Sequence, residues 1–510
     1  MPALYPHEVR KIAQGAGAAS GFAGFFFPSL RARGLGEEKP VPPYSAIIYK
    51  EDDEVRAEDW KSRKIASGEA GVNDASVIQS AIDSVANAGG GKVFIRAGTY
   101  IIPEVPDGGN AIEIKPNVEV IGEDRNTLLK LSENISVSSH SYAIILTDNS
   151  ALIDLSVDGN RAALEGLLLD GVSMRGNYCK IVRVYIKDCP RYNVRAFNVS
   201  SILIANCIAE HACLSNFMLD SISHSIIAHC IAYLAGRNGI SCDTLRGCDV
   251  IGNTCYENSF SGIRCGDGIM NTAIVGNSCL KNAAAGIRTH QEAIGLVIAN
   301  NICRENDFGI NLENGKYNIV SNNLCQRNGR GIRLAYSSHN FIIGNYCLEN
   351  YLENDPSGEN ILLAKDNHYN IIKNNVCRIG EGERSSQYGI RITGWSPQNT
   401  NNIIIDNDVA NGGASANILD EGDNTLIKRN LGYTTENSGT ATFSGDGTTT
   451  QFSIAHGLVS EPSKVQVTPM TEDAAGDFYV TKDATNIYVN YLSAPPSGSN
   501  NVKLSWYAEV

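Results

Sequence analysis

The segment 253–263, NTCYENSFSGI, is one copy of a unit that recurs along the middle of the chain. Most copies contain an N-x-C triplet, a second Asn three residues after the Cys, and then a Gly-Ile step. The triplets begin at Asn253, Asn277, Asn301, Asn323, Asn345 and Asn375, and the Gly-Ile steps begin at Gly239, Gly262, Gly286, Gly309, Gly331 and Gly389. Self-similarity at a spacing of 22 to 25 residues is typical of a solenoid.

Each unit contains short β-branched runs separated by Asn and Gly, which suit strands and left-handed corners. The spaced leucines and helical stretches of leucine-rich repeats are missing from these units. We therefore predict an all-β fold, a right-handed parallel β-helix with three short strands per turn. Residues 112–432 provide about 13 turns, or a rod of about 60 Å, and stacked Asn side chains are expected to form an amide ladder at one corner.

The fourteen cysteines follow the same repeat and show no C-x2-C spacing of a zinc site. One Cys per unit is typical of a small apolar side chain inside a stack. We expect these residues to fill the core of the solenoid rather than to form disulfides or a metal site.

The composition excludes several classes of protein. Of 510 residues, 42 are Lys or Arg and 55 are Asp or Glu, so the net charge is −13, which argues against nucleic acid as a partner. No apolar run of about 18 residues is present, so a membrane span is not expected. The apolar segment 15–27 is interpreted as part of an N-terminal arm rather than a signal peptide.

Four regions follow from the changes in pattern. Residues 1–44 form the arm, 45–111 a capping region with an amphipathic helix and the first strand, 112–432 the β-helix, and 433–510 a tail. The tail has about six alternating segments separated by Gly and Pro turns, which predicts a small antiparallel, sandwich-like β-domain.

The motif Gly71-Val-Asn-Asp74, continued by Ile78-Gln79 and by Gly98-Thr-Tyr100, resembles the N-terminal signature of the pectate-lyase-like superfamily. In that family an amphipathic helix covers the open end of the β-helix, which otherwise exposes strand edges and apolar side chains. The tail is similar to β-domains of viral tailspike and surface proteins. These resemblances imply an extracellular or virion-associated protein, a homotrimer, and a polysaccharide partner.

Strand alternation after each Gly-Ile step predicts which side chains face outward. If Gly is position zero, positions two and four point away from the core. The second position supplies Arg264, Arg288, Asn311, Arg333 and Arg391; the fourth supplies Asp243, His290 and Glu313; Asp267 and Tyr336 come one residue later, and Trp395 lies near Arg391. We expect a stripe on one face that suits a long anionic ligand; a solvated strand face with ion-pair ladders is the alternative.

The segment 286–292, GIRTHQE, is similar in placement to the catalytic G-F-D-P-H-E step of the mannuronan C-5 epimerases. By position His290 corresponds to the family's His, and Glu313 to the Asp on the next turn. Arg288 replaces an Asp of the family, and Ala285 replaces its catalytic Tyr, for which Tyr336 is a distant substitute. The resemblance implies proton abstraction from a uronate by His290, paired with Glu313, with arginines binding the carboxylate. Epimerisation and lyase β-elimination both follow from that step.

Two other functions remain open at this point. A glycoside hydrolase needs two carboxylates across a sugar linkage, and Asp243 with Asp267, or Asp267 with Glu313, have suitable spacing along the stack. A non-catalytic tailspike or surface fibre would use the β-helix as a rigid spacer. No cofactor is assigned, although Ca²⁺ could bridge carboxylates of the stripe.

Overall fold

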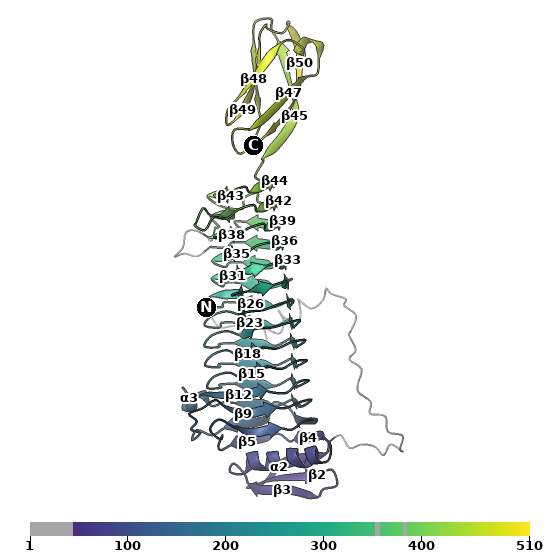
Figure 1. The fold of residues 1–510 in the computed structure, drawn as a ribbon, viewed down its shortest axis with the longest axis vertical. Helices are drawn as coiled ribbons and strands as arrows, with labels where there is room; N and C mark the ends of the chain where they lie inside the picture. The colour runs from purple at the N-terminus through teal and green to yellow at the C-terminus, as the bar shows by residue number, and fades with distance from the viewer. Residues whose placement is uncertain (1–43, 352–357, 381–384) are drawn as a thin grey trace, which may run out of the picture. The chain divides into compact units, whose positions relative to one another are not determined.

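The computed structural model describes residues 44–351, 358–380 and 385–510. The predicted arm falls almost entirely on residues 1–43, which lie outside the described part. The middle of the chain is a parallel β-helix of about 14 turns, one more than predicted (Figure 1). The predicted fold class is confirmed.

Three parallel sheets run along the β-helix, and each turn adds one short strand to each of them. The first sheet, sheet A, includes β4 (Gly91–Ile95) to β44 (Leu426–Lys428), and the second, sheet B, includes β5 (Gly98–Ile102) to β40 (Val376–Arg378). The third, sheet C, has 13 strands: β6 (Asn110–Ile114), β9 (Ser141–Leu146), β12 (Leu169–Met174), β15 (Val194–Phe197), β18 (Phe217–Asp220), β21 (Ile240–Asp243), β24 (Ile263–Cys265), β27 (Ala285–Thr289), β31 (Phe308–Glu313), β35 (Arg330–Ala335), β38 (Glu359–Leu363), β41 (Tyr388–Ile392) and β43 (Ala416–Asp420).

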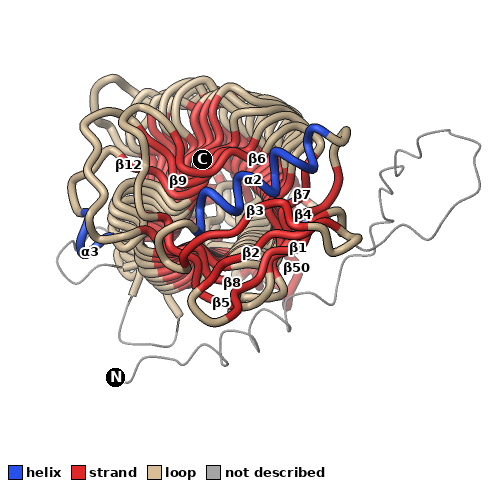
Figure 2. The backbone as a smooth tube through the Cα atoms, turned by 90° about the horizontal axis from the view of Figure 1, so that it is seen from below, coloured by secondary structure: helices blue, strands red, loops and turns tan. Residues whose placement is uncertain are grey.

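The N-terminal end of the β-helix is covered by α2 (Asp74–Asn87) and an antiparallel ladder of β1 (Ala46–Glu51), β2 (Glu54–Asp59) and β3 (Lys64–Glu69) (Figure 2). Asp74 explains why the cap motif contains a carboxylate. It is fully buried, accepts hydrogen bonds from the Ile101 and Gly71 amides at 2.6 and 3.0 Å, and pairs with Lys50 at 2.8 Å. This carboxylate therefore connects the helix to the first turn.

Asn side chains form the ladders that the repeat predicted. Asn301 is typical: its Nδ2 donates to Asn323 Oδ1 at 3.0 Å, and its Oδ1 accepts from Asn277 Nδ2 at 3.0 Å. Within the described residues the longest ladders occur at three places rather than one, running through Asn253 to Asn430, Asn258 to Asn350, and Asn318 to Asn402. Single amide pairs, such as Asn193 with Asn216 and Asn367 with Asn399, join turns elsewhere. Buried amides that satisfy one another in this way hold successive turns in register.

The recurrent Gly of the Gly-Ile step has a steric cause. A Cβ on Gly309 would lie 2.5 Å from the carbonyl oxygen of Gly331, so two neighbouring turns approach too closely for a side chain. Left-handed conformations occur instead at corners, including the residue before each N-x-C triplet, such as Gly276 and Asn300 with φ of +68° and +56°, and the second residue after the Cys, such as Lys281 with φ of +51°. Asn tolerates this conformation better than other non-glycine residues.

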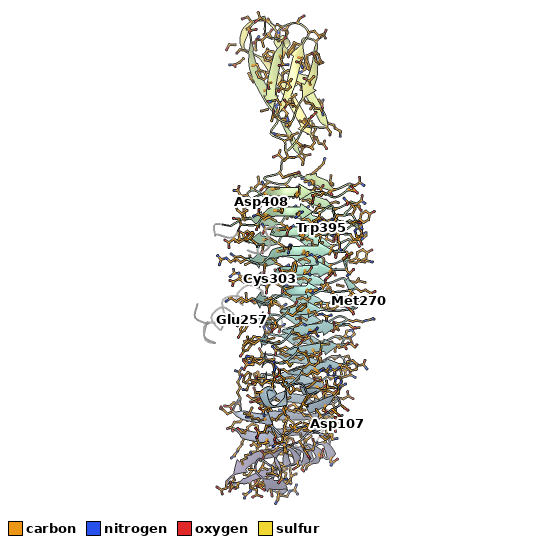
Figure 3. All side chains as sticks on the ribbon, turned by 90° about the vertical axis from the view of Figure 1, so that its left-hand side faces the viewer. Asp107, Glu257, Met270, Cys303, Trp395 and Asp408 are labelled. Carbon is orange, nitrogen blue, oxygen red and sulfur yellow. The ribbon has the colours of Figure 1, made fainter. Side chains whose placement is uncertain are left out.

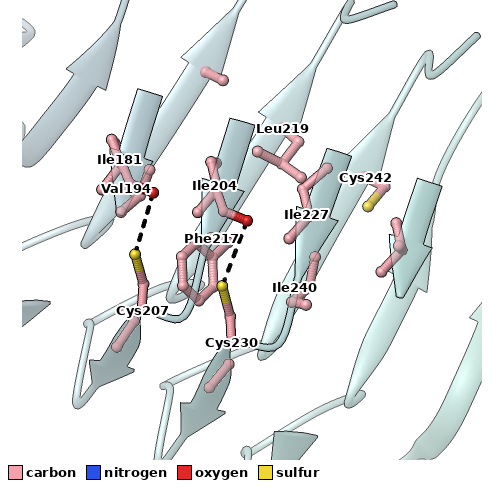
Figure 4. Packing of buried hydrophobic residues seen from close by; sticks show 14 of the residues in the cluster. Ile181, Val194, Ile204, Cys207, Phe217, Leu219, Ile227, Cys230, Ile240 and Cys242 are labelled. Carbon is pink, nitrogen blue, oxygen red and sulfur yellow. Dashed lines mark hydrogen bonds between the residues drawn. The ribbon is translucent and has the colours of Figure 1, made fainter. Parts of the chain in front are cut away.

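The cysteines fill the core, as predicted. All fourteen are free thiols and only Cys213 is not fully buried. Cys255, Cys279 and Cys303 are in register on adjacent strands of sheet B, and the Cys207 and Cys230 thiols pack against aliphatic neighbours and donate to backbone carbonyls (Figure 4).

We expect Ellman's reagent to react readily with Cys213 alone in the folded protein, and with all fourteen thiols after unfolding. The melting temperature should not change when a reductant is added, because no disulfide is present to break. A melting temperature that falls in dithiothreitol would contradict this prediction.

The C-terminal segment forms two antiparallel sheets, each of three strands. One contains β45 (Glu436–Gly445), β50 (Gly498–Glu509) and β47 (Lys464–Pro469). The other contains β46 (Gln451–Ala455), β49 (Asn486–Tyr491) and β48 (Phe478–Lys482). The C-terminal segment has its own hydrophobic core, which includes Phe452, Val489 and Trp506.

Candidate functional site

Sheet C has the register that the Gly-Ile steps predicted. Ile240, Ile263 and Ile287 are paired across adjacent strands and are fully buried. The next residue of each strand points outward and forms what we call the outer row of sheet C. The outer row consists of Ser173, Arg195, Met218, Ser241, Arg264, Arg288, Asn311, Arg333, Leu362 and Arg391.

Ion pairs join successive turns along this face. Arg264 contacts Asp243 at 2.6 Å, and Arg288 contacts Glu313 at 3.1 Å. His290 Nδ1 lies 3.3 Å from Asp267 Oδ1 on the preceding turn. The pairing of His290 with Glu313 is therefore wrong: Glu313 leans toward Arg288, and the carboxylate that contacts His290 is Asp267.

A groove of about 380 Å³ opens on sheet C near these pairs. It is lined by Arg288, Phe308, Asn311, Glu313, Arg330, Arg333, Leu362 and Trp395. The guanidiniums of Arg330 and Arg333 lie 5.6 and 5.7 Å from the centre of the Phe308 ring. The groove thus combines cations with an aromatic face, which suits an anionic ligand that also has an apolar side.

Among the described residues, Arg333 is the arginine of this groove that no carboxylate contacts. Its Nη1 donates to Asn311 Oδ1 at 3.0 Å, and among the described residues no carboxylate oxygen lies within 4.0 Å of it. Burial lowers the pKa of Arg333, the charge of Glu313 opposes the shift, and the positive charges of Arg330 and Arg288 add to it. A bound anion would stabilise a buried cation that has no directly contacting carboxylate among the described residues.

The far end of the groove is held by a buried carboxylate. Glu359, 1% exposed, contacts Arg330 at 3.0 Å and Arg391 at 3.3 Å. Arg391 also lies over the rings of Tyr388 and Trp395, at 4.9 and 5.9 Å. Trp395 is half exposed and close to the C-terminal end of the β-helix (Figure 3). Tyr336 instead packs beside Leu362 and faces Lys365, and no described contact joins it to His290.

Strict alternation missed Phe308 and Arg330. Counting back two residues from the buried Ile310 and Ile332 predicts an inward direction for both. The structure instead places both side chains, each partly buried, in the lining of the groove. Their shared position before Gly, in register across the two strands, is the signal that could have identified them.

Acidic residues cluster on the turns before the groove. Asp220 and Asp243 are paired in register on β18 and β21. Burial raises the pKa of Asp243, Arg264 lowers it, and the charges of Asp220 and Asp267 raise it further. A carboxyl whose pKa is raised in this way has a property of a general acid.

A second polar cluster, missed by the sequence analysis, lies on earlier turns of sheet C. Asp170 is 1% exposed and has Arg195 and Arg191 at 3.5 and 4.0 Å. Burial raises the pKa of Asp170 to about 6, although the two arginines oppose the shift. His140 Nε2 lies 2.6 Å from Arg191, and desolvation and the nearby arginines lower the pKa of His140. No Gly-Ile step marks this region, so the repeat gave no signal.

The raised pKa of Asp170 predicts that the free energy of unfolding depends on pH. Because folding favours the protonated carboxyl, this group contributes most below pH 4, and its contribution is lost as pH rises toward about 6. Relative to Asp170→Asn, the wild type should lose about 3 kcal/mol of unfolding free energy between pH 3 and pH 7. Urea unfolding at both pH values measures this, with His140→Gln in both backgrounds as a control for the neighbouring titration. A pH-independent difference would contradict it.

Neither a metal site nor a membrane span is found in the described part of the chain. In those residues, no group of three or more His, Cys, Asp or Glu side chains is placed to hold a metal ion. The described residues therefore offer no set of ligands for the Ca²⁺ that the sequence suggested. Within the same residues, no helix is long and apolar enough to cross a membrane.

Comparison with known families places the repeats among β-helix proteins. The family described as "Right handed beta helix region" matches residues 120–279, and the family "Periplasmic copper-binding protein (NosD)" matches residues 291–456. Mannuronan C5-epimerase AlgE3 of Azotobacter vinelandii is 27% identical over 214 residues, 39% of this chain and 12% of AlgE3. Alginate lyase 7 of the same organism is 27% identical over 192 residues, 34% of this chain and 22% of its own length.

Solved structures share the fold. The A-module of mannuronan C-5 epimerase AlgE4 of Azotobacter vinelandii has a TM-score of 0.55 at 20% identity, covering 71% of this chain and 97% of the module. A mutant tailspike protein of E. coli bacteriophage HK620, in complex with a pentasaccharide, has a TM-score of 0.54 at 14% identity and covers 88% of this chain and 92% of its own. These matches confirm the resemblance to pectate-lyase-like β-helix proteins, including the mannuronan C5-epimerases.

Proposed function

We propose that this protein binds an acidic polysaccharide along sheet C and acts on a uronate residue by proton abstraction, as a lyase or a C-5 epimerase. The observation that carries the proposal is Arg333, a partly buried cation without a carboxylate partner in the described structure, in a groove lined by two further arginines. Guanidinium groups bind carboxylates with two parallel hydrogen bonds. The relatives named as mannuronan epimerases and an alginate lyase support a uronate as the ligand.

The chemistry follows from the residues beside the groove. Arg288 lines the groove, and His290 is two residues further along the same outward face, about 7 Å away along the strand. His290 would take the C-5 proton while Asp267 orients its ring. Arg288 and Arg333 would bind the substrate carboxylate and stabilise the negative charge that develops on it. Return of a proton to the opposite face gives the epimer; loss of the C-4 oxygen gives the unsaturated product.

Proton NMR in deuterium oxide tests this directly, with mannuronan as substrate and neutral polysaccharides for comparison. We expect deuterium at C-5 or new olefinic signals with the wild type, and neither with His290→Gln. Gln291→Ala, an exposed neighbour, should behave as the wild type. If His290→Gln reacts as fast as the wild type, another group removes the proton.

Glycoside hydrolysis is the second candidate, favoured by the raised pKa of Asp243 beside Asp220 and Asp267. Asp243 would protonate the leaving oxygen and a neighbouring carboxylate would activate water or attack the sugar. New reducing ends without deuterium incorporation, lost in Asp243→Asn, would favour this reaction. If neither reaction occurs, a tailspike or surface fibre that binds the polysaccharide becomes the better proposal.

The remaining proposals concern the setting of the protein. An extracellular or virion-associated location agrees with the similarity to a periplasmic protein family and to bacteriophage tailspikes. A homotrimer stays a prediction from the tail domain, and sedimentation equilibrium of the full chain would test it.

A further inference from the structure

Three buried polar atoms without a hydrogen-bond partner lie close together on the early turns of sheet C. They are Asp170 Oδ1, Ser173 Oγ and Arg195 Nε. Asp170 and Ser173 belong to β12 and are 1% and 0% exposed, and Arg195 is the neighbour of Ser173 in the outer row. Buried polar groups in folded proteins are nearly always satisfied, so a cluster of three indicates a place where further atoms bind.

The charges around these atoms favour an anion. Asp170 is a single carboxylate with three arginines acting on it: Arg191, Arg195 and Arg175. Arg191 and Arg195 have side chains 17% and 15% exposed and lie next to the Asp170 carboxylate. Even with Asp170 ionised, the cations outnumber the anion, and an arginine side chain is long enough to turn toward a ligand while its stem stays packed.

Aromatic rings flank the same cluster. The Arg195 and Arg175 guanidiniums lie 5.4 and 5.7 Å from the centre of the Phe197 ring, which is 37% exposed. Arg175 also lies over Tyr142, at 4.5 Å, and donates to its hydroxyl oxygen. An exposed ring beside cations and unsatisfied oxygens suits a sugar ring, which presents both hydroxyls and an apolar face.

We propose that Asp170, Ser173, Arg191 and Arg195 form a second binding site on sheet C, separate from the groove, for an anionic sugar residue with a free hydroxyl. Arg191 and Arg195 bind the acidic group. Asp170 Oδ1 accepts a hydrogen bond from a sugar hydroxyl, and the Ser173 hydroxyl donates to or accepts from another. The site adds to the proposed function, on which the choice of acidic sugar rests.

The spacing of the two sites implies how a polymer would use them. Arg195 and Arg333 belong to the same outer row and are six strands apart, or about 29 Å. A chain that spans this distance can occupy both sites at once, and the second contact then forms within the same complex. We expect a long mannuronate oligomer to bind at least 10-fold more tightly than a trisaccharide.

Isothermal titration calorimetry of the full chain with a mannuronate trisaccharide tests the site. We expect two classes of binding site in the wild type. Arg333→Met should weaken binding to the groove by about 10- to 100-fold and leave the second class unchanged. Ser173→Ala should weaken only the second class, by about 5- to 10-fold. The uncharged mannose trisaccharide should bind to neither site. Comparison of a sulfated trisaccharide with the carboxylated one shows which acidic group the second site prefers.

Ser173→Ala tests binding at the second site without an expected loss of stability. It removes a hydroxyl that has no partner, so the melting temperature should stay the same or rise. Ser278→Ala, on strand β26 (Ser278–Leu280) of sheet B and outside both proposed sites, is the control and should leave binding unchanged.

The outcomes distinguish this site from the groove. If Arg333→Met abolishes all binding, the second site does not exist and the proposed function stands. If Ser173→Ala binds as the wild type does, the unsatisfied atoms hold only water and the proposal is overturned. Binding that is sensitive to Ser173→Ala but not to Arg333→Met would support the second site and contradict the groove. Absence of any binding would overturn both.

Discussion

Replacing Asn301 by Ala is expected to lower the free energy of unfolding by about 3–5 kcal/mol. Asn301 is fully buried, and its side chain makes four hydrogen bonds: it accepts from the Asn277 amide and side chain and donates to Asn323 and to the Ile274 carbonyl. Alanine leaves the Asn277 amide without its acceptor inside the stack. Urea unfolding followed by circular dichroism measures the change.

Arg304→Ala is the control for this prediction. Arg304 is exposed on the outer face of the neighbouring strand β30 (Ile302–Arg304), and its replacement should change stability by less than about 0.5 kcal/mol. If Asn301→Ala is as stable as Arg304→Ala, the amide ladder does not hold the turns together. Failure of the Asn301 variant to fold at all would agree with the prediction in direction and exceed it in size.

Arg333→Met is expected to weaken binding of acidic oligosaccharides to the groove by about 10- to 100-fold, since one charge-assisted contact is lost. Methionine keeps the apolar stem against Phe308 and removes the charge. Because Arg333 has no carboxylate partner among the described residues, stability should be unchanged or slightly higher. Titration calorimetry and thermal melting of the same samples test both statements.

Salt gives an independent check on Arg333. Binding of an anionic polymer by the wild type should weaken as sodium chloride is added, and the variant should depend on salt less steeply. Arg304→Met, which removes an exposed charge from sheet B, should affect neither affinity nor its salt dependence. Equal affinity in Arg333→Met and the wild type would remove the main support for the anionic ligand.

The fold could be predicted from sequence because the repeat is a local pattern with one structural solution. A recurrent N-x-C triplet and Gly-Ile step fix which residues stack on which, so the register of Ile263, Ile287 and Ile310 follows once the solenoid is accepted. The number of turns was slightly low because the parallel stack begins before residue 112, with β4 and β5. The cap was predictable for the same reason, because a short local motif supplies the buried Asp74 carboxylate that accepts a hydrogen bond from the Ile101 amide.

The site was predicted less completely. Alternation correctly identified the outward direction of Arg264, Arg288 and Arg333. It was counted only forward from each Gly, so it made no assignment for Phe308 and Arg330, which precede the Gly and line the groove. The partner of His290 was also wrong. Whether a side chain leans toward the turn before or after it depends on neighbouring charges, and Arg288 holds Glu313 away from His290.

The sequence by itself determined the parallel β-helix, its cap and the row of outward side chains, because each follows from periodicity over neighbouring residues. Only the tertiary structure decided which charges neutralise one another. It left Arg333 without a carboxylate in direct contact among the described residues, and it buried Asp170 and Ser173 with unsatisfied atoms. These features depend on distances between turns and on the space around each side chain, which no pattern along the chain specifies.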